Sequence, residues 1–189
     1  MKKLTSLLLL ILVFSLVGCN NVEKTSKVTL CDYNNIDLSK NNDLNENEYV
    51  AKYLLENSTV ENYSKEEVEQ YVTALEEYYN EYATSLNITF EEYITKTMNQ
   101  TKEEFYKEAK NAAIEYVKSK DILMEIAKKE KIELTDEDYE NYLKELLEYT
   151  SYNSLEDFKN NIKENNQEKD MRETAYFEKI LEFIIAQNK

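Results

Sequence analysis

Apolar residues recur every three or four positions through most of the chain after residue 45, which is the spacing of one face of an α-helix. The same spacing predicts helices over about 46–56, 65–86, 89–98, 102–130, 136–149, 155–163 and 168–187. The most regular stripe, within 65–86, comprises Tyr71, Val72, Leu75, Tyr78, Tyr79, Tyr82 and Leu86. The pattern therefore predicts an all-α fold.

Capping boxes mark the starts of several of these helices. In such a box, a Ser or Thr side chain accepts a backbone hydrogen bond, and an acidic residue three positions later returns one. The pairs are Ser64 with Glu67, Thr101 with Glu104, Thr135 with Asp138 and Ser154 with Asp157. The sequence has no proline and one glycine, Gly18, so the helices must end at Asn, Ser and Thr, as in "YTSYNS" and "KENNQ".

The chain before residue 64 has a different pattern. It opens as a polar tether, passes through two short strand-like pieces at about 28–30 and 36–38, and reaches the helix at 46–56. We interpret it as a spacer with a small hairpin or extended arm. The predicted organisation is a signal peptide at 1–18, a tether and arm at 19–63, and a helical domain at 64–189.

The first 18 residues carry a targeting signal. Lys2 and Lys3 precede an almost unbroken apolar run over residues 4–17, which is typical of a secretory signal and short for a permanent membrane span. The following "SLVGCNN" resembles the bacterial lipobox, in which the cysteine thiol receives a diacylglyceryl group and the bond before it is cut. Cys19 is the predicted lipidation site, and two acyl chains suffice for stable anchoring. The alternative is an ordinary secreted protein with a chance cysteine after its signal.

Composition narrows the classes of function. The net charge is −15 at pH 7, which excludes nucleic acid as a natural partner and repels an anionic membrane surface. There is no histidine, and no glycine follows Gly18, which excludes glycine-rich phosphate loops, histidine triads and His/Cys zinc sites. Cys31 is the only thiol besides Cys19, so a lipidated chain has no intramolecular disulfide.

The densest acidic run is "TDEDYE" at 135–140. It lacks the glycine of an EF-hand loop and lies where a helix is expected to begin, where acidic residues complement the helix dipole. We therefore predict no metal, no cofactor, no catalytic residue and no small-molecule substrate. Composition alone leaves open an enzyme that uses paired carboxylates, but no second feature of the sequence supports one.

Several blocks resemble the C-terminal helical domain of trigger factor, and more closely the trigger-factor-like lipoproteins of clostridial bacteria. In chain order they are "KVTLCDYNNIDL", "FEEYI", "TKEEF", "ILMEIAKKE", "IELTDEDY", "SLEDFKNNI" and "FEKILEFII". The resemblance covers roughly residues 27–187 and lies in the order of the blocks. In the first block, Cys31 and Asn35 stand where that family commonly has glycine. The resemblance implies an extended, multi-helix chaperone domain that is also similar to the core helices of SurA and PrsA.

One departure from that family bears on activity. Its full-length members carry an FKBP-type prolyl isomerase domain between the arm helix and the C-terminal helices, whereas here only "LENSTVENYS" occupies that interval. We therefore expect no peptidyl-prolyl isomerase activity and no enzymatic activity of another kind.

The resemblance implies a membrane-anchored, extracytoplasmic holdase that binds unfolded exported polypeptides without ATP. The chain has 16 tyrosines, and tyrosine provides apolar area with a polar tip, which suits adaptable binding surfaces. The candidate client-binding residues are Tyr71, Tyr78, Tyr79, Tyr82, Tyr93, Met98, Tyr149 and Tyr152. Four of them, Tyr71, Tyr78, Tyr79 and Tyr82, cover more than one face of a single helix, so they cannot all be core if only one stripe is buried, although a stripe of aromatics is usually packing. The alternative function is a cell-surface interaction lipoprotein with a closed helical bundle.

Overall fold

The computed structural model describes residues 26–41 and 44–189, so the predicted signal peptide and Cys19 lie outside the described residues. The described chain forms two compact units. One contains residues 60–119, and the other contains Val28–Thr59 together with Lys120–Lys189. The arm therefore belongs to the same unit as the C-terminal helices. The predicted division between arm and helical domain near residue 63 stays a prediction.

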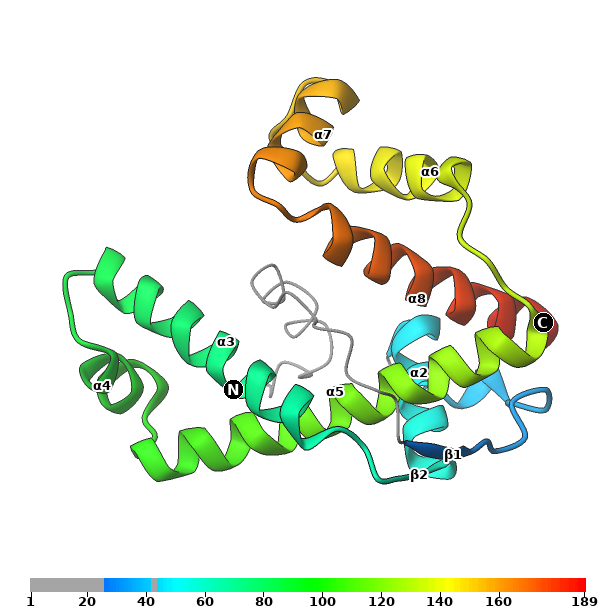
Figure 1. Cartoon of the computed structure of the whole chain (residues 1–189), viewed down its shortest axis with the longest axis horizontal. Helices are drawn as coiled ribbons and strands as arrows, with labels where there is room; N and C mark the ends of the chain where they lie inside the picture. Colours follow the sequence, from blue (N-terminus) through cyan, green and yellow to red (C-terminus); the bar gives the residue numbers. More distant parts are fainter. Residues whose placement is uncertain (1–25, 42–43) are drawn as a thin grey trace. The chain divides into compact units, whose positions relative to one another are not determined.

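Helices dominate the described residues, which confirms the all-α prediction (Figure 1). The α-helices are α2 (Glu46–Asn57), α3 (Lys65–Ser85), α4 (Phe90–Glu92), α5 (Lys102–Glu130), α6 (Asp136–Leu147), α7 (Leu155–Glu164) and α8 (Glu168–Gln187). A π-helical turn, η2 (Tyr93–Met98), continues α4, and a 3-10 turn, η1 (Leu38–Lys40), lies in the arm. The predicted helices lie close to these bounds.

Side-chain caps explain why the helices begin where they do. The Glu104 backbone N–H donates to Thr101 Oγ1 at 3.2 Å, and the Thr101 N–H donates to the Glu104 carboxylate at 2.8 Å. Thr135 forms the same reciprocal box at the start of α6, and Ser64 and Ser154 accept the expected backbone bonds. A further box, Thr89 with Glu92, begins α4 and was not predicted.

Asparagine replaces glycine where the backbone becomes left-handed. Positive φ angles of 55–58° occur at Asn62, Asn87, Asn99, Lys131 and Asn166. Asparagine tolerates this region better than other non-glycine residues. The prediction that helices end at polar residues in place of glycine is confirmed at Asn87, Asn99 and Asn166, whereas Asn62 follows strand β2 and the residue after α5 is Lys131.

The predicted second strand at 36–38 is wrong. Strand β1 (Lys27–Thr29) pairs with β2 (Thr59–Glu61) instead. The backbone N–H of Ile36 donates to Asn188 Oδ1 at 2.7 Å, so it is not available to a strand ladder. Asp37 then caps the turn η1 by accepting the Ser39 backbone N–H.

The unit of Val28–Thr59 and Lys120–Lys189 is built on α8, which packs against α2 and α6. Its buried side chains include Leu54 of α2, Ile126 of α5 and Ile184 of α8. The arm is fixed to this core by Tyr33, which is buried, donates its hydroxyl hydrogen to Glu130 and accepts an Asn188 side-chain N–H at its carbonyl. A second core, between α6, α7 and α8, is centred on Leu143, Ile162 and Ala175.

The unit of residues 60–119 is an antiparallel pair of helices, α3 and the first part of α5, joined through α4 and η2 (Figure 1). One core cluster contains Val68 and Tyr71 of α3 with Ala113 and Val117 of α5. A second cluster lies at the end where α4 is found, and its buried members are Ile94, Phe105 and Ala109.

Candidate client-binding surface

The exposed apolar surface of this helical pair is a stripe along one side of α3. Tyr78 and Tyr82 are 40% and 47% exposed, and Leu86, the residue that follows the helix, is 48% exposed. Their spacing of four residues places them one above the other on the helix. We call these residues the α3 stripe. Tyr149 is the only other large hydrophobic side chain of comparable exposure among the described residues.

Aromatic rings of the same unit support the α3 stripe from behind. Tyr82 meets Tyr93 edge to face, with ring centroids 5.4 Å apart, and Tyr78 meets Tyr79 in the same way at 5.3 Å. Tyr79 in turn stacks on Tyr93 at 5.9 Å and meets the buried Phe105 at 5.7 Å. Such pairs contribute about 0.5–1.5 kcal/mol each beyond area burial. The exposed rings are therefore held by a rigid aromatic layer.

The short α4–η2 segment positions Tyr93 against α3. The Thr89–Glu92 capping box begins it, and Ile94, which is fully buried, fixes it to the core. A hydrogen bond from Lys96, together with those from Thr89, lowers the pKa of Glu92 to about 2. The left-handed Asn99 ends η2 and lets the chain enter α5.

The phenols of this cluster are not activated. Burial raises the pKa of Tyr79 and of Tyr93 above the usual value, and burial together with the neighbouring Glu76 carboxylate raises that of Tyr106 to about 12. These hydroxyls stay protonated at physiological pH. The surface therefore provides contact area and weak hydrogen bonding.

The sequence around the α3 stripe is acidic. Residues 66–95 contain eight Asp or Glu residues and no Lys or Arg. Glu77 and Glu81 are exposed and directly precede Tyr78 and Tyr82 in the chain. An apolar stripe with an acidic border attracts segments that carry apolar and basic side chains together.

The other candidate residues lie elsewhere. Tyr71 is only 6% exposed and packs edge to face on Tyr116 at 4.4 Å, so it belongs to the core and not to a surface. Met98 packs against the cluster around Ile94. Tyr149 and Tyr152 belong to the other unit: Tyr149 is 86% exposed, and Tyr152 stacks on Phe158 at 5.4 Å. The interpretation that the tyrosines cannot all be core is confirmed.

Comparison with known families identifies the helical part of the chain. Residues 40–186 match the model described as the bacterial trigger factor protein (TF) C-terminus. The chain belongs to the trigger factor C-terminal family. No curated protein and no solved structure matched it.

The family match covers α2 to most of α8, and so includes the α3 stripe and its supporting rings. Leu86, Phe90 and Phe105 of this trigger factor C-terminal domain were not among the predicted site residues. The spacing Tyr78, Tyr82, Leu86 was a signal that could have identified the first of them. The other two required the tertiary structure, because they approach α3 from α4 and α5.

Two further features describe the part of the chain that the structure covers. Its helices include none that is long and apolar enough to cross a membrane. Within the same residues, no group of three or more Cys, Asp or Glu side chains is arranged to hold a metal ion.

Proposed function

We propose that this protein is a membrane-anchored, extracytoplasmic holdase that binds newly exported, unfolded polypeptides without ATP. The trigger factor C-terminal family is a chaperone-type family. The observation that carries the proposal is the α3 stripe, because three large apolar side chains are exposed at four-residue spacing and two of them, Tyr78 and Tyr82, pack on further aromatic rings. An exposed apolar surface of this kind marks an interaction site.

The mechanism is weak contact at several points. A stripe of this size contacts only a few side chains of a client at a time, so affinity comes from repeated engagement of a long unfolded chain. The acidic border of the stripe favours basic clients and keeps the protein soluble. Binding shields exposed apolar segments before they reach one another, which slows aggregation.

The anchoring part of the proposal rests on the apolar run at 4–17 and on Gly18 before Cys19. Cys19→Ala removes the acylation site, and the variant should leave the membrane fraction or accumulate uncleaved without lipid label. Equal lipid labelling of the variant and the unchanged protein would contradict the anchor.

The proposal also includes the absence of prolyl isomerase activity. The interval 55–64 consists of the end of α2, strand β2 and the Ser64 cap of α3. The protein should leave a proline-limited refolding phase, which lasts tens of seconds or longer, at its uncatalysed rate. A rate that rises with protein concentration would overturn this point.

The chaperone activity itself is tested by light scattering of an aggregating client. The full chain, reconstituted in lipid nanodiscs, should suppress aggregation of several unrelated clients at modest molar excess and without nucleotide. Empty nanodiscs are the control. If scattering stays at the control level for every client, the holdase proposal fails and the closed-bundle interaction lipoprotein takes its place.

A further inference from the structure

The α3 stripe has a row of acidic side chains beside it on the same helix. Glu77 and Glu81 each precede a member of the stripe by one position, and both acids are exposed. One position corresponds to a rotation of about 100° around an α-helix, so the acids lie to one side of the stripe. The two acids are four residues apart, as are Tyr78 and Tyr82. The helix therefore carries two parallel rows, each with a rise of about 6 Å per step. We call Glu77 and Glu81 the acidic row.

The other side of the stripe faces the core of the same unit. Tyr79 and Ala83 follow Tyr78 and Tyr82 by one position. Tyr79 contacts Phe105 of α5, and Ala83 is fully buried. The surface of α3 thus changes in a fixed order, from packed side chains through the apolar row to the acidic row. A partner that lies on the stripe meets the acidic row on one side only.

The acidic row is not neutralised within the described chain. Neither Glu77 nor Glu81 forms an ion pair with any of residues 26–41 or 44–189. By contrast, Glu69 of the same helix lies 3.2 Å from Lys110 of α5. Two like charges four residues apart slightly destabilise the helix that carries them. The row is therefore an unmatched charge beside an exposed apolar surface, and a basic partner complements both.

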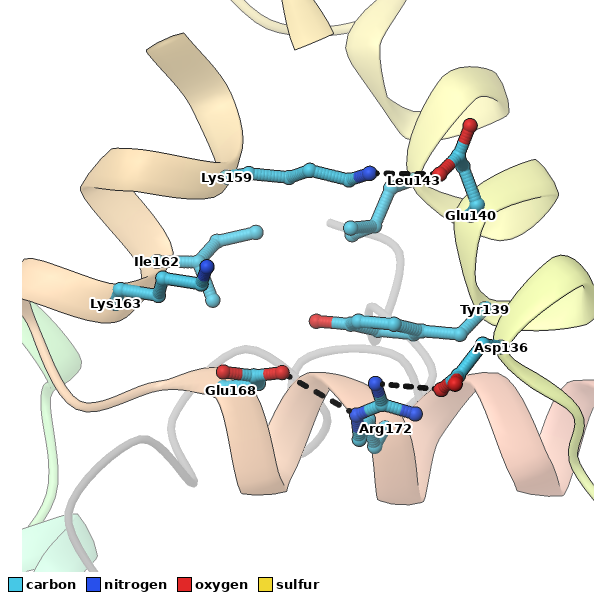
Figure 2. A pocket seen from close by; sticks show the side chains of 9 residues that line it. All are labelled: Asp136, Tyr139, Glu140, Leu143, Lys159, Ile162, Lys163, Glu168 and Arg172. Atoms are coloured by element: carbon cyan, nitrogen blue, oxygen red, sulfur yellow. Dashed lines mark hydrogen bonds and ion pairs between the residues drawn. The ribbon is translucent and has the colours of Figure 1, made fainter. Parts of the chain in front are cut away.

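The hollow between α6, α7 and α8 in the other unit differs, because its charges are balanced (Figure 2). Its charged lining consists of three acids and three bases. Arg172 Nη2 lies 2.9 Å from Asp136 and its Nε lies 3.4 Å from Glu168, while Lys159 Nζ lies 2.8 Å from Glu140. The third base is an exposed lysine. The acids of that hollow thus have partners within the chain, unlike those of the acidic row.

The sideways position of the acidic row distinguishes two forms of a bound segment. In an extended segment, the neighbours of a residue that faces α3 point to the opposite side, away from the acidic row. In a helical segment, the neighbours of a contacting residue point sideways, about 100° from it, and can reach the row. A helix also repeats its contacts every four residues with the same rise of about 6 Å as the stripe. The geometry of α3 therefore matches a helical partner.

We propose that the α3 stripe binds client segments as amphipathic helices, whose apolar row lies on the stripe and whose adjacent row carries Lys or Arg facing Glu77 and Glu81. This binding mode rests on the proposed holdase function and adds to it the conformation of the client and the placement of its charges. From Tyr78 to Leu86 the stripe rises about 12 Å, so two to three turns of a client helix engage at a time.

The handedness of the helix fixes the order of residues in such a client. Because α-helices are right-handed, the basic residues follow the apolar ones by one position if the client runs parallel to α3. They precede the apolar residues by one position if the client runs antiparallel. Basic residues two positions from the apolar ones lie on the opposite face of the client helix and do not reach the acidic row.

The first test measures fluorescence anisotropy of labelled peptides with the full chain in nanodiscs of zwitterionic lipid. Three peptides of one composition contain four repeats each. Leu-Lys-Ala-Gln places lysine one position after leucine, Leu-Gln-Ala-Lys places it one position before, and Leu-Ala-Lys-Gln places it on the opposite face. The tighter of the first two should bind about threefold to tenfold more tightly than the third, because it forms exposed ion pairs with the acidic row. Equal affinity of all three overturns the proposal.

The second test concerns the conformation of the client. Replacing each alanine of the tighter peptide by D-alanine disrupts the helix and keeps the composition and charge. This peptide should bind at least about tenfold more weakly. Equal affinity, or no binding of any peptide, overturns the helical binding mode. If the chain still suppresses aggregation of unfolded clients, the holdase proposal stands, whereas failure of that assay removes the holdase proposal as well.

A double variant locates the contact. Glu77→Gln with Glu81→Gln should weaken the tighter peptide about threefold to tenfold, with an unchanged thermal melt, because neither acid has an ion-pair partner within the described chain. The matched control is Glu66→Gln with Glu115→Gln, which removes the same charge from two exposed positions of the same unit. If the two double variants bind the peptide alike, the acidic row is not the contact and the proposal fails.

Discussion

Replacing Tyr78, Tyr82 and Leu86 together by glutamine should remove most client binding by the helical unit of residues 60–119. The three side chains are 40%, 47% and 48% exposed. With about 200 Å² for each large side chain, they offer roughly 250 Å² to a client. At about 25 cal/mol per Å² this area is worth ~6 kcal/mol if it is fully covered. A client that covers half of it should bind about 100-fold more weakly to the variant.

The same change should affect folding much less. Glutamine has a good helix propensity, and the lost packing is chiefly two edge-to-face ring contacts, Tyr78 with Tyr79 and Tyr82 with Tyr93. These contacts are worth about 1–3 kcal/mol together. Tyr71→Ala is the contrasting variant, because a side chain buried with Val68 and Val117 should cost about 3–5 kcal/mol on truncation.

The assay combines fluorescence anisotropy of a labelled unfolded client with a thermal melt followed by circular dichroism. Tyr78→Phe with Tyr82→Phe is the control that keeps aromatic area and should keep binding. Tyr79 is left unchanged, because it contacts Phe105 and Tyr93 and its removal would confuse folding with binding. A folded glutamine variant whose dissociation constant lies within twofold of the original would show that the α3 stripe is not the client surface.

Two further predictions concern stability. Lys131→Gly should stabilise the fold by about 0.5–1 kcal/mol, because the residue after α5 has a φ of 56° and a lysine side chain is unfavourable there. Denaturant unfolding measures the change in the free energy of unfolding. An equal gain from Asn87→Gly would argue against the reasoning. Burial, with Glu173 nearby, raises the pKa of Asp170 from 3.8 to about 6. Since the folded state then binds the proton more tightly than the unfolded state, stability should rise as pH falls from 7 to 4. Asp170→Asn should reduce this rise in melts recorded across that range, and the remainder comes from Glu178, whose pKa burial also raises.

The helices could be predicted from the sequence because their determinants are local. The 3.6-residue period of apolar positions predicts that a segment is helical. A capping residue such as Thr101 or Thr135 then predicts where the helix begins, to within one turn. The same local information predicts that the helices end at Asn, Ser and Thr, because the one glycine of the chain is Gly18. Neither inference needs knowledge of what the helix packs against.

The errors arose where distant residues decide the structure. The segment at 36–38 has the composition of a strand, but its backbone is bound by Asn188, which lies 152 positions away from Ile36 in the chain. Tyr71 and Tyr82 share one stripe in the sequence, yet Tyr71 packs with Val117 of α5 in the core, whereas Tyr82 packs its ring on Tyr93 and stays half exposed. Periodicity indicates which face is apolar, but not how far along that face a partner extends.

The acidic charge around the α3 stripe opposes contact between the stripes of two copies of the protein. Two copies of the protein that met stripe to stripe would bring together two segments with eight acidic and no basic residues each, and the repulsion would oppose apolar contact. An unfolded segment with basic side chains meets no such barrier. On the proposed function, the acidic border would weaken self-association through the stripe and leave the same apolar area available to a client of opposite charge.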